Sequence, residues 1–446
     1  MLIIKAYMET FLFDKHSPWW SDVGNIENDK VLTEFNAQKY QYRHPYLKTF
    51  AHQDSVIIIR GPRRIGKTTL LKLLVKDLLL NQNINPKNVL YYPCDRVENF
   101  NDLYNLVLNY LGLNLPGRKF IFLDEISFVR EWQRAIKDLW DSGDLKQTTV
   151  ILTGSNALDL KISGERLPGR RGDLDQVNID YYPLSFDQFV NLVGRDKDLK
   201  GLLDDYLTTG GFPHAINEFY GKNFISNHLY ETYLTWIEGD IHKAGKSERL
   251  MYPVLGEILS HLGSTVSWYK IAKNTGLGSH STVESYLDIF QQLFISFNLN
   301  FYSIDQRKTF LNKNKKIYFI DPVILQSAKC KLDGFTDRFF DYSSSFTFNQ
   351  EFLPGVMENV VASHLFQSGG RLSFGNLQDK EVDFVLTRSG KDHYFEVKYQ
   401  NTIKLTDFAF WQKNEPLTII TKNFSLIKNN LVFIKAEDFL NTPLPT

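Results

Sequence analysis

The sequence contains few cysteines and carries no net charge. Its 446 residues include two cysteines, Cys94 and Cys330, which lie too far apart in the chain to form a metal-binding motif or a disulfide framework. The formal net charge at pH 7 is zero, which excludes a uniformly basic nucleic-acid-binding protein but not a local basic patch. The low cysteine content favours a protein of the reducing cytoplasm.

Long apolar runs are also missing. No stretch approaches the roughly 20 apolar residues that a membrane-spanning helix needs. Charged residues such as Lys5, Glu9 and Asp14 interrupt the first residues, which therefore lack the apolar core of a secretory signal. We expect a soluble, cytoplasmic protein without a membrane partner. The 43% hydrophobic and 23% charged fractions are those of a globular protein, and roughly 150 residues per domain predicts about three domains.

A strand, a glycine-rich loop and a helix follow one another near the start of the chain. The apolar run 56–59 precedes the loop, and a leucine-rich stretch, 70–74, follows it. The spacing G-x-x-x-x-G-K-T lets backbone N–H groups point at the phosphates of a nucleotide, and the helix adds its positive end. Lys67 is predicted to reach the β and γ phosphates of ATP, and Thr68 to hold Mg²⁺. The predicted ATP-binding residues are Gly61, Pro62, Arg63, Arg64, Ile65, Gly66, Lys67, Thr68 and Thr69.

A second apolar strand ends in two acids. Residues 120–123 are followed by Asp124 and Glu125, a pattern typical of a buried parallel strand whose carboxyl end opens onto a site. ATP hydrolysis needs one carboxylate to hold Mg²⁺ and another to activate the attacking water. We assign Asp124 to the first role and Glu125 to the second. A surface acid pair after a core strand is the alternative.

Polar residues after the next strand are candidates for sensing the γ-phosphate. The predicted strand 149–153 leads to Asn156, and this residue or Ser155 is expected to meet the γ-phosphate and the attacking water. A simple polar strand end is the alternative. A later loop contains Arg170 and Arg171, and one arginine at a phosphoryl transition state is worth about 10³ to 10⁵ in rate. The arginine would complete its own site or that of a neighbour in an ATP-bound homo-oligomer. Solvated arginines without a catalytic role are the alternative.

A pair of glycines interrupts the helical pattern that follows. Gly210 and Gly211 precede Phe212 and Pro213. Glycine lets the backbone approach a planar ligand, and proline is favoured at the start of a helix. We predict a small helical lid in which Gly211 and Pro213 contact the adenine, although a plain turn between helices explains these residues nearly as well.

These motifs occur in an order that resembles a known family. The set comprises the phosphate loop, 123–125, 152–155, 169–170, 183–186 and 210–213. It resembles the bacterial and archaeal AAA+ ATPases related to the STAND nucleotide-dependent signalling proteins. The resemblance covers the chain from about residue 40 to the C-terminus. It implies a P-loop ATPase core followed by a C-terminal region of unassigned function.

The middle of the chain has the pattern of a winged helix. Residues 267–276 and 279–290 predict a short helix, a glycine turn and a serine-started amphipathic helix, as in helix-turn-helix modules. A strand-rich stretch follows, with basic residues that suggest the tip of a wing. Such modules bind DNA, which we expect as a partner, and they also dock proteins. The basic residues are Arg307, Lys308, Lys313, Lys315 and Lys316.

The last region carries a second carboxylate pattern. Glu358 lies on a predicted helix, Asp383 on a strand, and Glu396 and Lys398 on another strand whose alternation places both on one face. Convergent carboxylates suit Mg²⁺, and a neighbouring lysine stabilises the charge of a phosphorane. The order resembles the PD-(D/E)xK nuclease fold, with Asp383 and Glu396 as metal ligands. Val382 replaces the usual proline, and a surface charge pattern or an inactive nuclease fold are alternatives.

The predicted fold class is α/β, with a P-loop AAA+ core, a helical lid, a winged helix and a nuclease-like α/β domain. One interpretation is an ATP-driven DNA-processing enzyme with Mg²⁺-dependent nuclease activity. The other is a STAND-like nucleotide-controlled switch whose C-terminal fold is inactive and serves in docking. A helix from about residue 35 to Pro45 is also expected. The predicted domains are 1–34 (N-terminal segment), 35–190 (AAA+ core), 191–249 (lid), 250–335 (winged helix) and 336–446 (nuclease-like).

Overall fold

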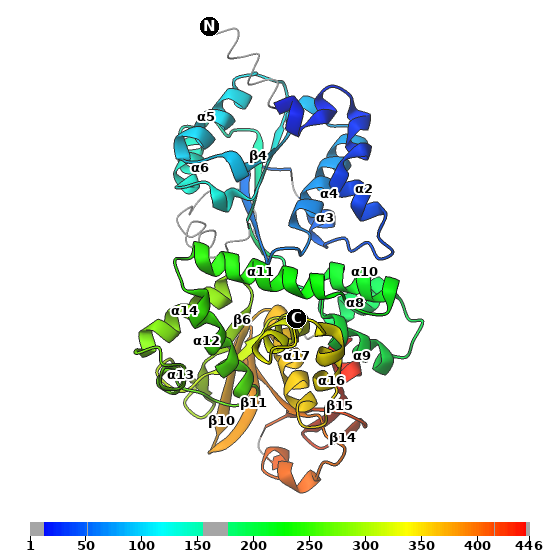
Figure 1. Ribbon diagram of the computed structural model, residues 1–446, viewed down its shortest axis with the longest axis vertical. Coiled ribbons are helices and arrows are strands. Elements are labelled where there is room, and N and C mark those ends of the chain that lie inside the picture. Colours follow the sequence, from blue (N-terminus) through cyan, green and yellow to red (C-terminus); the bar gives the residue numbers. More distant parts are fainter. Residues whose placement is uncertain (1–12, 51, 155–176, 414, 443–446) are drawn as a thin grey trace. The chain divides into compact units, whose positions relative to one another are not determined.

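The chain divides into two compact units, Met1–Tyr182 and Pro183–Thr446. The computed structural model, shown in Figure 1, describes residues 13–50, 52–154, 177–413 and 415–442. No helix in these ranges is long and apolar enough to cross a membrane. The finer division into five domains stays a prediction.

The first unit is built on a five-stranded, all-parallel sheet with the order β2-β3-β4-β1-β5. Strand β4 therefore lies between β1, which precedes the phosphate loop, and β3, which ends in the acids. Figure 1 shows α5 and α6 on one side of this sheet and α4 on the other, which explains why the strands are apolar along their length. The bounds are β1 Ser55–Arg60, β2 Val89–Pro93, β3 Lys119–Asp124, β4 Thr148–Gly154, β5 Asn178–Asp180, α4 Lys67–Leu80, α5 Phe100–Leu111 and α6 Trp132–Asp141.

The N-terminal segment covers the free edge of β2. The indole Nε1 atoms of Trp19 and Trp20 both donate to the carbonyl of Val89, at 2.9 and 3.0 Å. The Ser17 hydroxyl and the backbone of Tyr91 exchange hydrogen bonds of 3.0 and 3.2 Å. An uncovered edge strand invites pairing with other chains, so this segment has a structural role that its sequence did not reveal.

The expected helix up to Pro45 is wrong. Helix α2 (Lys30–Asn36) ends well before it, and the short helix α3 (Tyr46–Thr49) begins after it. The Asp29 side chain caps α2 by accepting from the N–H of Val31 at 2.9 Å, which fixes the start of the helix earlier than the apolar pattern suggested.

The second unit begins with helices and a small sheet. Helices α13 and α14 are each capped by a serine, Ser267 and Ser279, whose side chains accept backbone N–H bonds. Strands β6 and β9 pair antiparallel, and Val266 forms a bridge with Lys315. The bounds are α8 Phe186–Val193, α9 Leu199–Thr209, α10 Pro213–Lys222, α11 Asn227–Lys243, α12 Glu248–Ser260, α13 Trp268–Thr275, α14 His280–Gln292, β6 Ser296–Leu299 and β9 Lys316–Phe319.

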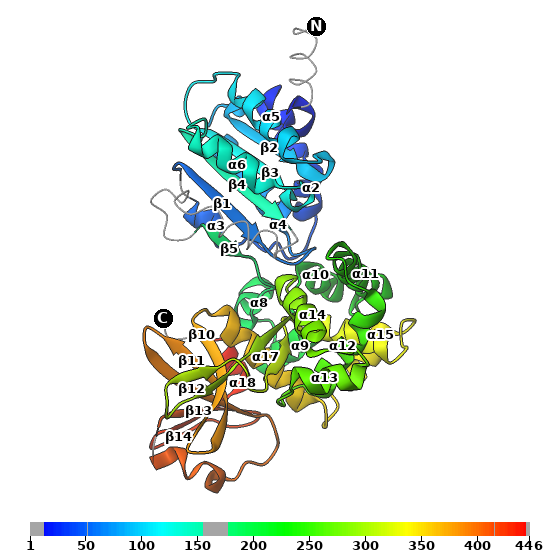
Figure 2. The same cartoon turned by 90° about the vertical axis from the view of Figure 1, so that its left-hand side faces the viewer.

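The second unit also contains a mixed eight-stranded sheet (Figure 2), with the order β14-β15-β13-β12-β11-β10-β7-β8, and, within the described ranges, four further α-helices. The β7–β8 hairpin joins this sheet because β7 pairs parallel to β10. The hairpin that was predicted as a wing is therefore an edge of the C-terminal sheet. The bounds are β7 Phe301–Ser303, β8 Lys308–Phe310, β10 Arg371–Leu377, β11 Lys380–Arg388, β12 Lys391–Lys398, β13 Leu417–Thr421, β14 Leu426–Lys428, β15 Leu431–Lys435, α15 Pro322–Leu332, α16 Phe339–Thr347, α17 Leu353–Gln367 and α18 Ala436–Leu440.

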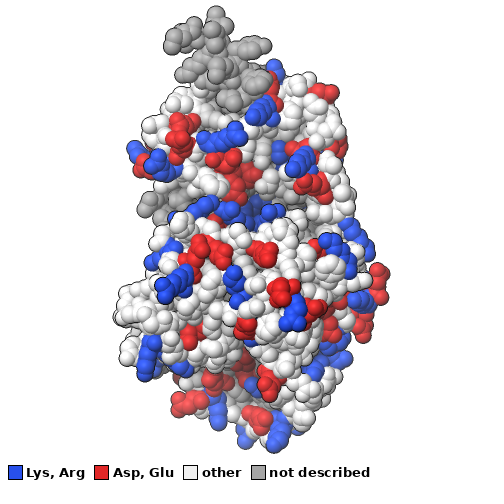
Figure 3. Space-filling view, in the orientation of Figure 1, with Lys and Arg blue, Asp and Glu red and all other residues white. Residues whose placement is uncertain are grey.

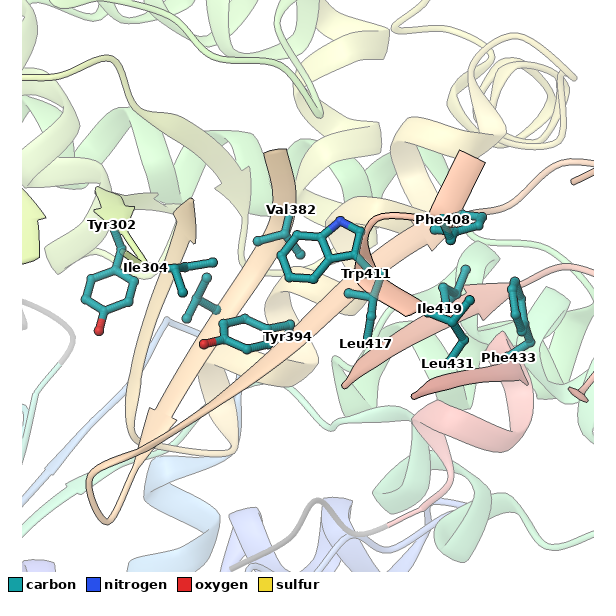
Figure 4. Packing of buried hydrophobic residues seen from close by; sticks show 11 residues of the cluster. Tyr302, Ile304, Val382, Tyr394, Phe408, Trp411, Leu417, Ile419, Leu431 and Phe433 are labelled. Atoms are coloured by element: carbon teal, nitrogen blue, oxygen red, sulfur yellow. The ribbon is translucent and has the colours of Figure 1, made fainter. Parts of the chain in front are cut away.

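One face of this sheet carries an apolar cluster, and the cluster reveals a β-bulge. Val382, which Figure 4 labels, and Val385 both belong to this cluster. Strict alternation would place the two on opposite faces. The pairing passes from Ser373–Val385 to Gly375–Val382, so β11 has one residue more than β10 in this interval. Bulges bend a strand and redirect its side chains, and Asp383 lies at this one.

Candidate functional site

Two glycines of the phosphate loop are required by the backbone. Gly66 has φ 107°, in the left-handed region that favours glycine, at the N-cap of α4. At Gly61, a Cβ atom would lie 2.4 Å from the carbonyl oxygen of Tyr181. Tyr181 therefore packs directly beneath the loop, a neighbour that the sequence motif did not indicate.

The lysine of the loop is held over the loop itself. Lys67 is 5% exposed, and its Nζ donates to the carbonyl oxygens of Gly61 and Pro62, both at 2.9 Å. The ammonium and the N-terminal end of α4 together offer positive charge to an anion. This arrangement fits the phosphates of a nucleotide.

The Asp124 carboxylate accepts hydrogen bonds from three hydroxyl groups. Its Oδ2 accepts from Thr68 Oγ1 and from the Tyr91 hydroxyl, both at 2.8 Å, and its Oδ1 accepts from the hydroxyl of Thr153. Thr68 and Asp124, which were predicted as magnesium ligands, are thus neighbours although they lie on different elements. Hydroxyl and carboxylate oxygens are the donors that Mg²⁺ prefers, so these two side chains fit the ion.

Glu125 follows in a rare backbone conformation. Its φ of 55° is left-handed, and its N–H donates to Thr153 Oγ1 at 3.1 Å. A non-glycine residue stays in this region only where the surrounding structure stabilises it, and such residues are enriched at functional sites. The turn ends β3 and leaves Glu125 half-buried beside Asp124.

Sequence reasoning missed Tyr91 and Thr153 as members of this site. Tyr91 is one of several apolar or aromatic residues of β2, and nothing in the local sequence distinguishes it from a core residue.

Aromatic side chains also lie around Tyr181 beneath the phosphate loop. The centroid of the His44 ring lies 4.3 Å from that of the Tyr181 ring. Burial lowers the pKa of His44 to about 4, so this ring is neutral at physiological pH.

The geometry of the phosphate loop does not test several predicted site residues. Asn156, Arg170 and Arg171 lie outside the described residues, and their roles stay predictions. Gly211 lies in the second unit, where its N–H donates to Asp321 Oδ2 at 2.7 Å. Pro213 begins α10. Their proposed contact with adenine likewise stays a prediction.

Gly211 has a packing role of its own. A Cβ on this residue would lie 2.1 Å from the carbonyl oxygen of Leu184, so only glycine fits. Burial raises the pKa of Asp321 to about 7, although the N–H groups of Gly211 and Val323 oppose the shift. The Gly-Gly stretch therefore anchors α9 and α10 to the start of α15.

The second predicted site is assembled from the residues that its pattern named. Lys398 Nζ lies 2.6 Å from Glu396 Oε1, which agrees with their expected place on one face of β12. The N–H of Asp383 donates to Glu396 Oε2 at 3.1 Å, and the N–H of Val397 donates to Asp383 Oδ2 at 3.0 Å. Glu358, on α17, completes this carboxylate cluster, which we define as Glu358, Asp383 and Glu396.

A lysine that was predicted to contact DNA lies inside this cluster. Lys316 is 2% exposed, and its Nζ lies 2.8 Å from Asp383 Oδ1 and 3.4 Å from Glu358 Oε1. The Tyr318 hydroxyl donates to the same oxygen of Glu358 at 2.7 Å. Across the described ranges, no group of three acidic, histidine or cysteine side chains is arranged to hold a metal ion. The assignment of Asp383 and Glu396 as ligands of a divalent ion therefore stays a prediction.

The charges of the cluster are coupled. Burial and the neighbouring charge of Asp383 raise the pKa values of Glu358 and Glu396 to about 7. Burial alone would lower the pKa of Lys316, but the attraction of Asp383 and Glu358 outweighs it and raises that pKa. The ammonium of Lys316 is therefore charged at neutral pH.

Two of the lysines that were predicted to form an exposed basic wing tip are buried. Lys315 and Lys316 are 6% and 2% exposed, and Lys315 Nζ donates to the carbonyl of Leu311. Lys313 is exposed. In the second unit, the face drawn in Figure 3 carries acids interspersed among its lysines and arginines rather than one basic field.

Helix α14, the second helix of the predicted helix-turn-helix, has an acidic surface. It contains neither lysine nor arginine, and its exposed positions include Glu284 and Asp288. Burial, with a contribution from Glu284, raises the pKa of Asp288. Phosphate backbones bind basic surfaces, and α14 offers them no lysine or arginine.

Comparisons with protein families match three successive regions of the chain. A family model described as an AAA domain matches residues 53–190, and two models described as domains of unknown function match residues 200–334 and 355–442. An uncharacterized protein of Haemophilus influenzae is 26% identical over 400 residues, covering 84% of this chain and 91% of that protein. An uncharacterized protein of Methanocaldococcus jannaschii is 25% identical over 380 residues, covering 75% and 74%.

Solved structures show weaker likeness. The Walker-type ATPase of Pyrococcus abyssi is 14% identical with a TM-score of 0.42, covering 61% of this chain and 91% of that chain. The replication initiator DnaA bound to AMPPCP and single-stranded DNA is 14% identical with a TM-score of 0.29, covering 60% and 88%.

The phosphate loop, the parallel sheet with β4 between β1 and β3, and the family match define the first unit as an AAA-type P-loop ATPase domain. In this chain the domain is followed by two regions that match domains of unknown function.

Proposed function

We propose that the chain binds ATP with Mg²⁺ and hydrolyses it at the phosphate loop and the carboxyl end of β3. The observation that carries this proposal is the 2.8 Å hydrogen bond between Thr68 Oγ1 and Asp124 Oδ2. It joins the first turn of α4 to the end of β3, so the two groups that would hold the ion meet at the mouth of the loop. A glycine-rich turn without a nucleotide role would not require this meeting.

The residues divide the chemistry among them. The loop amides and Lys67 bind the phosphates, and Thr68 with Asp124 would hold Mg²⁺, whose charge offsets that developing on the transferred phosphoryl group. Glu125 orients the attacking water and accepts its proton. Asn156 is proposed to sense the γ-phosphate, and Arg170 or Arg171 to stabilise the transition state, within an ATP-bound homo-oligomer.

Nucleotide binding by the Lys67→Ala variant tests this proposal. We expect the variant to lose binding of a fluorescent ATP analogue, because the loop loses its positive side chain. Lys76→Ala is the matched control, since Lys76 lies on the same helix and pairs with Glu27 at 2.6 Å. Equal binding by wild type and Lys67→Ala would refute the proposal.

For the second unit, we propose a docking domain of a nucleotide-controlled switch rather than a metal-dependent nuclease. Lys316 in the carboxylate cluster supports this choice. Helix α14 exposes acids and contains no lysine or arginine, which supports a protein partner over DNA. A cleavage assay with Mg²⁺ and Mn²⁺ on single-stranded and duplex DNA is expected to show no cutting. Cutting that Asp383→Asn abolishes would restore the nuclease interpretation.

DNA binding belongs to the competing proposal of an ATP-driven DNA-processing enzyme. Its basic residues would be Arg307, Lys308 and Lys313, which are exposed. Each phosphate contact contributes about −0.9 to the slope of log K against log[salt] on duplex DNA. If this surface binds DNA, changing all three residues to alanine flattens the slope by about 2 to 3 units. An unchanged slope argues for the docking interpretation.

A further inference from the structure

The ammonium of Lys316 lies 2.8 Å from Oδ1 of Asp383, a predicted metal ligand, and 3.4 Å from Oε1 of Glu358. We propose that Lys316 is the resident cation of the carboxylate cluster, and that the folded chain binds no divalent ion there while this lysine is present. The inference concerns the second unit and does not depend on ATP hydrolysis.

The oxygens of Asp383 and Glu396 already receive donors from the chain. Asp383 Oδ1 binds Lys316 at 2.8 Å and Oδ2 receives the N–H of Val397 at 3.0 Å. Glu396 Oε1 binds Lys398 at 2.6 Å and Oε2 receives the N–H of Asp383 at 3.1 Å. Mg²⁺ requires near-octahedral oxygen coordination, so its binding through Asp383 Oδ1 and Glu396 Oε1 would compete with the ammonium groups of Lys316 and Lys398.

Glu358 is similarly confined. Its Oε1 receives both Lys316 and the hydroxyl of Tyr318. Its Oε2 lies close to Gly263, where an added Cβ would come within 2.8 Å of that oxygen. The side chain is therefore enclosed from two directions, and it is oriented toward the lysine.

The position of Lys316 is fixed by contacts that do not involve its charge. Asn359 of α17 accepts from the N–H of Phe319 at 2.7 Å and donates to its carbonyl at 3.0 Å. The Ser363 hydroxyl donates to the carbonyl of Ile320 at 2.6 Å. Strand β9 is thus fastened to the helix that carries Glu358, and this attachment delivers Lys316 to the cluster.

The charge balance explains why the lysine stays. The three carboxylates of the cluster meet two ammonium groups, those of Lys316 and Lys398, and a fourth carboxylate, that of the exposed Glu381, lies 3.6 Å from Lys316 Nζ. Lys316 is the more buried of the two lysines, with a side-chain exposure of 2% against 36%. Removing one partner of a buried ion pair leaves an uncompensated charge and is strongly destabilising. An added divalent cation would relieve that charge once the lysine is gone.

Thermal unfolding of the nucleotide-free full chain, with and without millimolar Mn²⁺, tests the proposal. We expect Lys316→Ala to lower the Tm of the second unit by roughly 5–10 °C, and Mn²⁺ to restore part of the loss. Lys315→Ala is the matched control, because Lys315 is the adjacent buried lysine and bonds the carbonyl of Leu311 instead of the cluster. Its Tm is expected to be independent of Mn²⁺, as is that of wild type.

Two further measurements keep the proposal falsifiable if Lys316→Ala does not fold. The first is Mn²⁺ binding by the wild type and by Asp383→Asn, which we expect to be indistinguishable without nucleotide. A Mn²⁺ site in the wild type that Asp383→Asn removes would overturn the proposal. The second is the Lys316→Met, Asp383→Asn double variant, which should be more stable than Lys316→Met alone. A double variant less stable than Lys316→Met would also overturn it.

Discussion

The hydroxyl of Tyr91 donates to Oδ2 of Asp124 at 2.8 Å, on the same oxygen that receives Thr68. Lys72 supports the tyrosine, with its Nζ 3.5 Å from the centroid of the Tyr91 ring and 3.0 Å from Asp29 Oδ2. Burial lowers the pKa of Lys72, although Asp29 opposes the shift. The N-terminal segment is therefore connected, through Lys72 and Tyr91, to the carboxylate that would hold Mg²⁺.

Tyr91→Phe is expected to weaken the contribution of Mg²⁺ to nucleotide affinity by about tenfold, because a hydrogen bond to a charged group contributes about 1.5 kcal/mol or more. Affinity for fluorescent ADP measured with Mg²⁺ and with EDTA isolates this contribution, since only the former uses Asp124. Tyr92→Phe is the control, because that ring packs on His16. An equal loss of affinity in both conditions would indicate general damage to the fold instead.

The paired tryptophans predict non-additive stability. Because Trp19 and Trp20 donate to one carbonyl, each single change to phenylalanine leaves Val89 with a partner. The double change leaves a buried acceptor unsatisfied, and its loss in free energy of unfolding should exceed the sum of the single losses by about 1 kcal/mol or more. Denaturant unfolding of the four chains measures this coupling. Simple additivity would show that the edge of β2 does not depend on these bonds.

The raised pKa of Asp321 predicts that the free energy of unfolding depends on pH. Burial raises its pKa from 3.8 to about 7, so between these values the folded chain holds a proton that the unfolded chain has lost. The stabilising contribution is complete below about pH 3.8 and is lost as the pH rises through 7. Asp321→Asn should reduce the fall in the free energy of unfolding over this interval. An unchanged pH profile in the variant would assign the fall to other groups.

Assembly is tested by mixing variants. If Arg170 or Arg171 acts across a subunit boundary, inactive chains carrying arginine-to-alanine changes should regain ATPase activity when mixed with Glu125→Gln chains. Mixed interfaces then contain one intact carboxylate and one intact arginine. Failure to recover activity at every mixing ratio, with folded chains, would place the arginine elsewhere.

Local patterns predicted the parts of the fold that local chemistry determines. The glycines of the loop, the acids after β3, and the shared face of Glu396 and Lys398 follow from spacing along one element. Tyr91 could not be singled out, because its role depends on β2 lying beside β3. Lys316 was assigned to a basic wing for a similar reason, since its neighbours come from α17 and β11, far along the chain.

Errors in the elements themselves also have physical causes. The residues before Pro45 have helical composition, but the cap at Asp29 starts the helix early and it ends at Asn36. The β7–β8 hairpin looked like a wing because hairpin sequences do not specify the sheet they join. The pairing of β7 with β10 joins residues that are far apart in the chain, so the local sequence does not predict it.

ATP turnover by Glu125→Gln shows whether this glutamate activates the attacking water. The account predicts that this variant binds ATP with wild-type affinity and hydrolyses it about 10² to 10⁴ times more slowly, because only the water-activating group is lost. Glu131→Gln is the matched control, since Glu131 is also a left-handed glutamate, with φ 56°, but pairs with Arg134 at 2.8 Å. Wild-type turnover by Glu125→Gln would contradict the account.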